Sequence, residues 1–355
     1  MELLPIISST DFAPRLAVTY DTKGDGTVLV KATAGRYYQV VGQDIFNREY
    51  ATKPNGTNQS TLFNWNPATL RYDIFRQRSV PLLGLDPGDF DPYYKDEASL
   101  GLEWQFVPAW AFKVRGVWWE IGDPFWSTDQ YNAAGLAVPD VRNWEDGFRE
   151  YQGAVFELNR AFRDGWTVRT NYTWSDGNGN TFGTGDGTTD ADTLFEGLGG
   201  VEVGTGRTDA TIRNREGSGN TEREHNLNLV GLKVFPIGNQ SLGLGGYFGF
   251  RSGEPWGRRA STQLRHPVTN QPINTTTYVE PRDAHYMEDT YTLNLTGFYQ
   301  FPIRGRFEGR LGVEAVNVTN EQEIISINSN NGLPDVGKSA IQTPREIRLQ
   351  LGVTF

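Results

Sequence analysis

The last nine residues of the chain, 347–355, read IRLQLGVTF and alternate apolar with polar side chains. Every second residue from Ile347 to Phe355 is apolar, and the residues between them are Arg, Gln, Gly and Thr. Successive side chains of a β-strand point to opposite faces of its sheet. The stretch therefore predicts a strand with one apolar and one polar face, and FEGRLGVEA at residues 307–315 predicts another.

Outward from this stretch, about eleven segments are predicted as strands, each long enough to cross a bilayer when tilted. Helical periodicity is absent wherever the two-residue alternation is present, so we expect no helix. The predicted strands are 12–22, 26–38, 95–106, 109–121, 150–163, 166–176, 223–235, 240–252, 289–301, 306–318 and 344–355.

Short and long connections alternate between these strands. Short turns such as Lys23-Gly24-Asp25-Gly26 and Arg163-Asp164-Gly165 contrast with much longer loops. The long loops lie near 39–94, 122–149, 177–222, 253–288 and 319–343. A soluble β-sandwich would also alternate within its strands, but loops of this length are uncommon in soluble domains. In an outer-membrane barrel, short turns face the periplasm and long loops face outside. The sequence therefore predicts an all-β, antiparallel transmembrane β-barrel.

The composition agrees with a barrel. Aromatic residues make up 13% of the 355 residues and glycines number 41, yet the hydrophobic fraction is only 37% and the mean hydropathy is -0.52. A soluble core of this size would be richer in Leu, Ile and Val. The polar lumen, polar loops and thin apolar band of a barrel account for these values. No run of 18 apolar residues is present, so we expect no transmembrane helix.

Aromatic residues fall near the predicted strand ends, which is typical of the two girdles of a barrel at the membrane interfaces. At the loop ends these are Tyr37, Tyr38, Trp118, Trp119, Tyr172 and Trp174. At the turn ends they are Phe106, Phe162, Trp166, Phe235 and Phe301.

Charge and cysteine content exclude several kinds of protein. The net charge of -10 and a sequence pI of about 5.0 argue against nucleic acid as a partner, because phosphate binding needs a basic face. The chain has no cysteine, which excludes disulfides, thiolate metal sites and a cysteine nucleophile. The first residues lack the basic and apolar regions of a signal peptide, so we expect Met1 to begin a fragment of a longer chain.

A family resemblance rests on several motifs in order along the chain. These are FAPRLAVTYD at 12–21, RSGEPW at 251–256, VNVTN at 316–320, and PREI at 344–347 followed by the terminal Phe355. Their order and spacing resemble the barrel of TonB-dependent outer-membrane receptors, most closely the Oar-like group, over essentially the whole chain.

The resemblance implies a location in the outer membrane of a Gram-negative bacterium and a barrel of 22 strands. It also implies an N-terminal plug domain and transport energised through TonB. Residues 1–355 would then form the C-terminal part of the barrel, without the plug domain and the first half of the wall. Because an antiparallel barrel needs an even number of strands, eleven strands cannot close alone, and the rest must come from elsewhere.

Charged residues at one set of alternate positions are expected to face the lumen, where they could contact a plug or a solute. They are Glu103, Arg115, Arg169, Glu308, Arg310 and Glu314. The simpler interpretation is a ladder of cross-strand pairs lining a wet interior. Loop tryptophans are candidates for ligand contact, although a neighbouring loop could equally cover them. They are Trp65, Trp126, Trp144 and Trp256.

Phe355 at the end of an alternating strand is similar to the assembly signal of outer-membrane proteins. The expected partners are therefore the β-barrel assembly machinery and outer-membrane lipid. The alternative interpretation of Phe355 is an ordinary girdle aromatic.

Catalytic motifs are not visible, so the chain is not expected to be an enzyme and no cofactor is expected. His225, His266 and His285 have no spacing that would make a metal pair, and the motifs of hydrolase elbows and phosphate-binding loops do not occur. The loop 183–192 carries three aspartates that could bind Ca²⁺, but a solvated acidic loop is the favoured interpretation.

Three functions remain open on the sequence. The first is a transport barrel that takes up a scarce solute, which could be a metal chelate, a glycan or a peptide. The second is a structural or binding subunit of a cell-envelope assembly. The third is a secreted, soluble β-sandwich that binds glycans.

Overall fold

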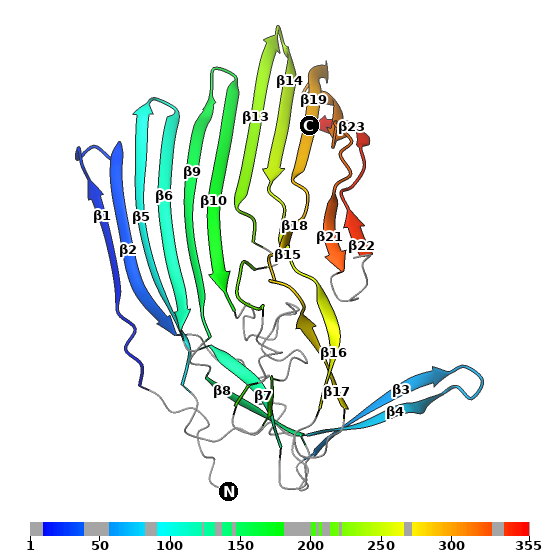
Figure 1. Ribbon diagram of the computed structural model, residues 1–355. Helices are drawn as coiled ribbons and strands as arrows, with labels where there is room; N and C mark the ends of the chain where they lie inside the picture. Colours follow the sequence, from blue (N-terminus) through cyan, green and yellow to red (C-terminus); the bar gives the residue numbers. More distant parts are fainter. Residues whose placement is uncertain are drawn as a thin grey trace, which may run out of the picture.

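The computed structural model describes residues 10–38, 57–81, 91–122, 124–131, 137–143, 147–180, 200–203, 206–207, 214–219, 222–265, 272–328 and 337–354. Its main body is a single curved sheet of eleven antiparallel strands (Figure 1). In sheet order these are β1 (Arg15–Asp21), β2 (Val28–Tyr38), β5 (Tyr94–Val107), β6 (Trp110–Gly122), β9 (Arg149–Arg163), β10 (Trp166–Gly179), β13 (His225–Ile237), β14 (Gln240–Arg251), β19 (Thr290–Arg304), β20 (Phe307–Val316) and β23 (Glu346–Thr354).

The eleven predicted strands are confirmed, and each corresponds to one strand of this sheet. Neighbours in the sheet follow one another along the chain, joined in turn by a tight turn or a long connection. This is the up-and-down order of an antiparallel barrel wall. The sheet is open, with β1 at one edge and β23 at the other (Figure 1).

The first tight turn shows how short connections are fixed by local chemistry. The carboxylate of Asp21 accepts hydrogen bonds from the backbone N–H groups of Lys23 (3.1 Å), Gly24 (2.9 Å) and Gly26 (2.7 Å). Both glycines have positive φ, 72° and 74°, a conformation that other residues adopt only at a cost. Aspartate and glycine together therefore hold the β1–β2 hairpin closed.

The prediction of long loops needs a correction, because each of them carries further strands. Their side chains are mostly polar on both faces, as in RASTQLR and PINTTTY, so the apolar alternation that identified the wall is missing. These strands are β3 (Thr57–Asn66), β4 (Arg71–Pro81), β7 (Phe125–Tyr131), β8 (Ala137–Asn143), β11 (Gly200–Val203), β12 (Gly206–Arg207), β15 (Pro255–Trp256), β16 (Arg259–Arg265), β17 (Pro272–Tyr278), β18 (His285–Tyr286), β21 (Ile324–Asn328) and β22 (Gly337–Ile341).

One face of the eleven-stranded sheet is apolar from edge to edge. A single register row crosses nine strands and carries only Val, Leu, Phe and Tyr. The row is Tyr20, Val30, Leu102, Val114, Phe156, Tyr172, Leu227, Phe250 and Tyr291. Pairs of this kind stabilise a sheet, but they do not explain why the outer side of the row is uncovered.

The apolar face is not buried by another layer. Among the described residues the only buried hydrophobic side chains are Tyr93 and Tyr278, whereas Leu349 and Leu351 are 83% and 85% exposed. A β-sandwich would bury this face against a second sheet, because apolar surface is unfavourable in water. The sandwich alternative is therefore wrong for this chain.

The height of the apolar face matches the thickness of a membrane. Tyr94 and Trp104 stand ten residues apart near the two ends of β5, and so do Tyr291 and Phe301 on β19. At about 3.4 Å per residue and a tilt of about 40°, ten residues span about 26 Å along the barrel axis. Among the described residues no helix is long and apolar enough to cross a membrane.

Candidate functional site

The polar face of the sheet carries all six residues that were predicted to face the lumen. Register and alternation place them opposite the apolar row on every strand concerned. They are Glu103, Arg115, Arg169, Glu308, Arg310 and Glu314. These residues spread over the wall and do not converge on one point, which is the arrangement of a lined channel rather than of a catalytic centre.

Ion pairs join some of these residues across strands. Lys31 Nζ lies 2.7 Å from Glu103 Oε1, and Lys113 Nζ lies 3.9 Å from the same oxygen. Glu314 Oε2 lies 3.6 Å from Arg348 Nη1. The side chains are partly exposed, so each pair is worth about 0–1 kcal/mol. The ladder therefore lines the wall and contributes little to its stability.

Several arginines of the polar face take no part in such pairs. Within the described part of the chain, Arg115 and Arg169 form no ion pair or side-chain hydrogen bond. Arg310 stacks over the ring of Phe298, with its guanidinium carbon 4.2 Å from the ring centroid. The polar face thus presents guanidinium groups that are available to a solute or another protein segment.

A cavity of about 460 Å³ opens on the polar face at the loop end of the wall. We call it the mouth cavity. Its lining comes from β14, from β19 and from the segments around β21 and β22. The lining residues are Arg223, Tyr247, Gly249, Arg251, Thr290, Thr292, Val316, Asn317, Ile325, Gln342 and Thr343. Its size falls within the range of small-molecule sites.

One wall of the mouth cavity is fixed by the buried Asn317. Its side-chain nitrogen donates to the carbonyl oxygens of Glu321 and Thr343, both at 2.8 Å. Its side-chain oxygen accepts from the backbone N–H of Glu321 at 3.2 Å. Asn317 has a φ of 50°, a left-handed conformation that asparagine tolerates better than most residues. The loop after β20 is therefore held in one shape by hydrogen bonds within the protein.

Tyr247 and Gly249 shape the floor of the cavity. The Tyr247 hydroxyl donates to Asn228 Oδ1 at 2.8 Å, which lays the ring along the strand. A Cβ at Gly249 would lie 2.5 Å from that hydroxyl, so only glycine leaves room for the ring. The position of the Tyr247 ring in the floor of the cavity therefore depends on the glycine at position 249.

The loop cluster beyond the strands is held by a buried arginine. Arg282 is fully buried, and its side chain donates to the carbonyl oxygens of Ser218 (3.0 Å) and Arg215 (3.2 Å). Ser218 N–H in turn donates to Asp283 Oδ2 at 3.0 Å. Two connections far apart in the sequence, 214–219 and 281–284, therefore form one unit at the loop end of the wall.

A second loop contact surrounds Glu280. Its carboxylate accepts from Arg258 Nε at 2.8 Å and lies 2.8 Å from His285 Nε2. Hydrogen bonding from Arg258, supported by the charge of His285, lowers the pKa of Glu280 to about 2. Hydrogen bonding to Glu280 raises the pKa of Arg258 in return. The charged groups of this site are paired with one another, which is typical of a structural link between loop strands.

The loop tryptophans fall into different situations. The Trp256 ring lies 4.6 Å from the His285 ring, so a neighbouring loop segment covers part of it. Trp65 is 51% exposed and packs on Tyr72 in the β3–β4 hairpin, with ring centroids 5.1 Å apart. Trp126 lies in β7, and Trp144 lies outside the described residues. A role for these tryptophans in ligand contact stays a prediction.

The aromatic girdle prediction needs one correction. Tyr37 and Trp119 lie on the polar face, where Trp119 stacks on Tyr151 at 5.3 Å. Each has an adjacent aromatic, Tyr38 or Trp118, and two consecutive residues of a strand cannot share a face. The other proposed girdle residues occupy the apolar face at the predicted ends. They are Tyr38, Phe106, Trp118, Phe162, Trp166, Tyr172, Trp174, Phe235 and Phe301.

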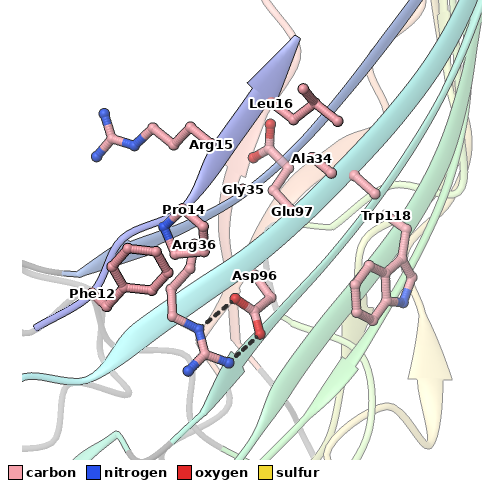
Figure 2. A pocket seen from close by; sticks show the side chains of 11 residues that line it. Phe12, Pro14, Arg15, Leu16, Ala34, Gly35, Arg36, Asp96, Glu97 and Trp118 are labelled. Carbon is pink, nitrogen blue, oxygen red and sulfur yellow. Dashed lines mark hydrogen bonds and ion pairs between the residues drawn. The ribbon is translucent and has the colours of Figure 1, made fainter.

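A shallow depression of about 580 Å³ lies at the loop end of β1, β2 and β5. Figure 2 shows the side chains that line it. Phe12, Leu16 and Trp118 supply apolar lining, and Arg36 pairs with Asp96 through two hydrogen bonds of 2.8 and 2.6 Å. Arg36 and Asp96 belong to the apolar face, because Arg36 alternates with Tyr38 and Ala34. Long charged side chains at the edge of an apolar surface can reach a polar layer, so the depression belongs to the margin of the apolar face and not to the polar face.

Sequence reasoning missed the residues of the mouth cavity. Tyr247, Gly249 and Arg251 occupy alternate positions between Phe248 and Phe250, so the polar face was readable. The sequence alone did not indicate that Arg223, Asn317 and Gln342 also line the cavity, because these residues reach it from distant connections.

Two further expectations concern residues outside the described part of the chain. Phe355, the proposed assembly signal, and the acidic loop 183–192 both lie there. Within the described ranges, no group of three His, Asp or Glu side chains could hold a metal ion.

Comparison with known proteins identifies the fold. No family model matches the sequence, and no curated protein matches it either. Solved structures do match. The outer membrane transporter YddB from Escherichia coli superimposes with a TM-score of 0.56 at 12% identity, covering 98% of this chain and 41% of YddB.

Two further structures agree. BauA, the ferric preacinetobactin receptor from Acinetobacter baumannii, gives a TM-score of 0.51 at 10% identity over 96% of this chain and 36% of that one. The ferripyoverdine receptor of the outer membrane of Pseudomonas aeruginosa gives 0.50 at 12% identity, over 96% and 32%. The chain therefore spans less than half the length of these structures, and it has the fold of part of their β-barrels.

Proposed function

We propose that this chain is part of the wall of a TonB-dependent receptor in the outer membrane of a Gram-negative bacterium, and that the receptor takes up a scarce solute. The uncovered apolar face carries this proposal. Lipid acyl chains are the one surrounding in which an edge-to-edge apolar face of this height is stable without a second protein layer.

The polar face supports a transport role. Its mixed charges and unpaired arginines suit a wet interior through which a polar solute moves. The mouth cavity lies at the loop end, where an incoming solute would first meet the wall. Two of the matching structures are a ferric preacinetobactin receptor and a ferripyoverdine receptor, and this favours a metal chelate over a glycan or a peptide as the solute.

The direction of the strands implies partners. All eleven strands pair antiparallel, so β1 and β23 run in the same direction and cannot close on each other as an antiparallel pair. An odd number of further strands is required between them. The rest of the barrel, a plug domain inside it, the TonB system and the barrel assembly machinery are the proposed partners.

Residues 1–355 contain no cysteine, so a single-cysteine variant has no competing thiol in this part of the receptor, and a direct test is possible. Leu295→Cys and Leu229→Cys place the thiol on the apolar face, and the adjacent Thr296→Cys and Asn228→Cys place it on the polar face. In isolated outer membranes, a charged maleimide should label the polar-face thiols at least about tenfold faster, because charged reagents avoid hydrocarbon. Equal labelling within each adjacent pair, or recovery of the protein in the soluble fraction, would contradict the proposal.

A further inference from the structure

The charge of the mouth cavity is unbalanced. Its lining holds two guanidinium groups, from Arg223 and Arg251, and no carboxylate. Arg223 is already neutralised, because its Nη2 lies 2.7 Å from Glu254 Oε1 and its Nη1 donates to the carbonyl oxygen of Ser252 at 2.7 Å. One positive charge is left over.

That charge belongs to Arg251. Within the described ranges its guanidinium makes no hydrogen bond, ion pair or ring contact. Glu254, three residues along the chain, pairs with Arg223. Asp289 precedes Thr290, the residue that pairs with Arg251 in the sheet, and its Oδ1 accepts the backbone N–H of Gly253 at 3.0 Å. Arg251 therefore stands at the cavity with its donors directed to no protein acceptor.

The neighbouring groups complete a site of suitable shape. Thr290 and Thr292 bring hydroxyl groups to the cavity from β19, next to Arg251 in the register. Gln342 is fixed at both ends of its amide, donating to the carbonyl oxygen of Tyr291 at 3.0 Å and accepting from the N–H of Glu323 at 3.1 Å. The walls of the cavity are therefore fixed, and of the groups named here only the exposed side chain of Arg251 has to be ordered when an anion binds, which limits the entropic cost of binding.

We propose that the mouth cavity binds an oxyanion group of the solute, a carboxylate or a phosphate, through the guanidinium of Arg251. The planar donors of arginine match the two oxygens of such a group, and a partly enclosed site screens the attraction less than open solvent does. The Thr290 and Thr292 hydroxyls supply further donors. This inference rests on the proposed transport function and adds the chemical class of the solute.

The first test uses the full-length receptor in isolated outer membranes and the arginine reagent phenylglyoxal. The adduct at Arg251 is measured by peptide mass spectrometry with malonate, with inorganic phosphate, or with sodium chloride at the same ionic strength. Malonate or phosphate should slow modification of Arg251 about threefold or more relative to chloride, as expected when most sites are occupied. Arg306, an exposed turn residue at the other end of the wall, should react at one rate throughout.

The second test measures affinity for inorganic phosphate and malonate by calorimetry. Arg251→Gln should weaken binding about tenfold or more, Arg251→Lys should retain part of it, and the matched Arg306→Gln should leave it unchanged. If neither anion protects Arg251 beyond the chloride control, the inference is wrong, even where cysteine labelling confirms the barrel. If protection holds while the labelling pattern fails, the oxyanion site stands and the transport proposal falls.

Discussion

The guanidinium carbon of Arg160 lies 3.8 Å from the centroid of the Trp166 ring, at the turn end of the apolar face. The same guanidinium donates to the carbonyl oxygens of Arg163 and Trp166, both at 2.5 Å, and only 6% of the residue is exposed. An arginine is thus the polar centre of the β9–β10 turn, and its aromatic neighbour covers it from the apolar side.

Replacing this arginine should destabilise the hairpin. Arg160→Met keeps an unbranched aliphatic side chain but removes the guanidinium that donates to two carbonyl groups, and we expect a loss of about 2–4 kcal/mol in the free energy of unfolding. Urea unfolding of the full-length protein in lipid vesicles measures it. The matched control is Arg163→Met, whose side chain is 58% exposed, and it should change stability by less than about 1 kcal/mol. Equal effects from both substitutions would show that the turn does not depend on Arg160.

The loop cluster makes a separate prediction. Arg282→Met removes the donors to Ser218 and Arg215 from a fully buried position. The free energy of local opening of residues 214–219 should fall by about 2–4 kcal/mol, because buried carbonyls lose their partners. Hydrogen exchange at the Ser218 amide reports this opening, while strand amides such as Leu295 should keep their protection. Unchanged exchange at Ser218 would mean that other contacts hold the cluster.

The contact between Glu280 and Arg258 should weaken in acid. Arg258 lowers the pKa of Glu280 to about 2. The contribution of the Glu280 carboxylate to the stability of this loop contact is therefore complete above the ordinary carboxyl pKa of 4.5, and it is lost as the pH falls toward 2. Protection of the Arg258 amide, which donates to Glu280 Oε1 at 2.9 Å, should therefore be constant from pH 7 to about pH 5 and decline below about pH 4.5. Glu280→Gln should lose most of this decline. A decline of the same size in that variant would assign it to another group.

Substitution of Gly253 should reduce the resistance to proteolysis of the loops only. A Cβ there would overlap the carbonyl oxygen of Met287, a backbone atom that cannot move aside alone. Gly253→Ala should displace the segment between β14 and β19, increasing limited proteolysis of 253–288 severalfold, while heat resistance of the barrel stays the same. Gly352→Ala, where the nearest side-chain atom would be 3.9 Å away, is the matched control and should change neither quantity. A Gly253→Ala variant that resists proteolysis as well as the control would contradict this reading.

The wall of the sheet could be predicted because its physical cause is local. A strand with lipid on one side and water on the other must alternate along its own sequence, and Leu349, Gln350 and Leu351 show this without any neighbour. The same rule shows why Tyr37 and Trp119 were assigned to the wrong face, since the alternation allows only one of two adjacent aromatics on the apolar side.

The loop hairpins and the mouth cavity could not be predicted in this way. Strands β16 and β17 pair through backbone groups while their side chains stay polar, so no periodic signal marks them. The cavity joins Arg223, Arg251 and Gln342, which are far apart along the chain and meet because the connections that carry Arg223 and Gln342 pack against the loop end of the wall. A buried Arg282 is still harder to foresee, because arginines are mostly exposed.

The two edges of the open sheet have a consequence for how the protein is made. Among the described strands, β1 and β23 each have a hydrogen-bonded neighbour on one side only. In hydrocarbon, every backbone group left without a partner costs several kcal/mol. In the membrane location proposed above, the free side of β23 therefore needs the backbone of another strand as its partner, so that insertion would be coupled to strand pairing. On that proposal the assembly of this wall would be templated, each edge strand pairing with the strand that completes it.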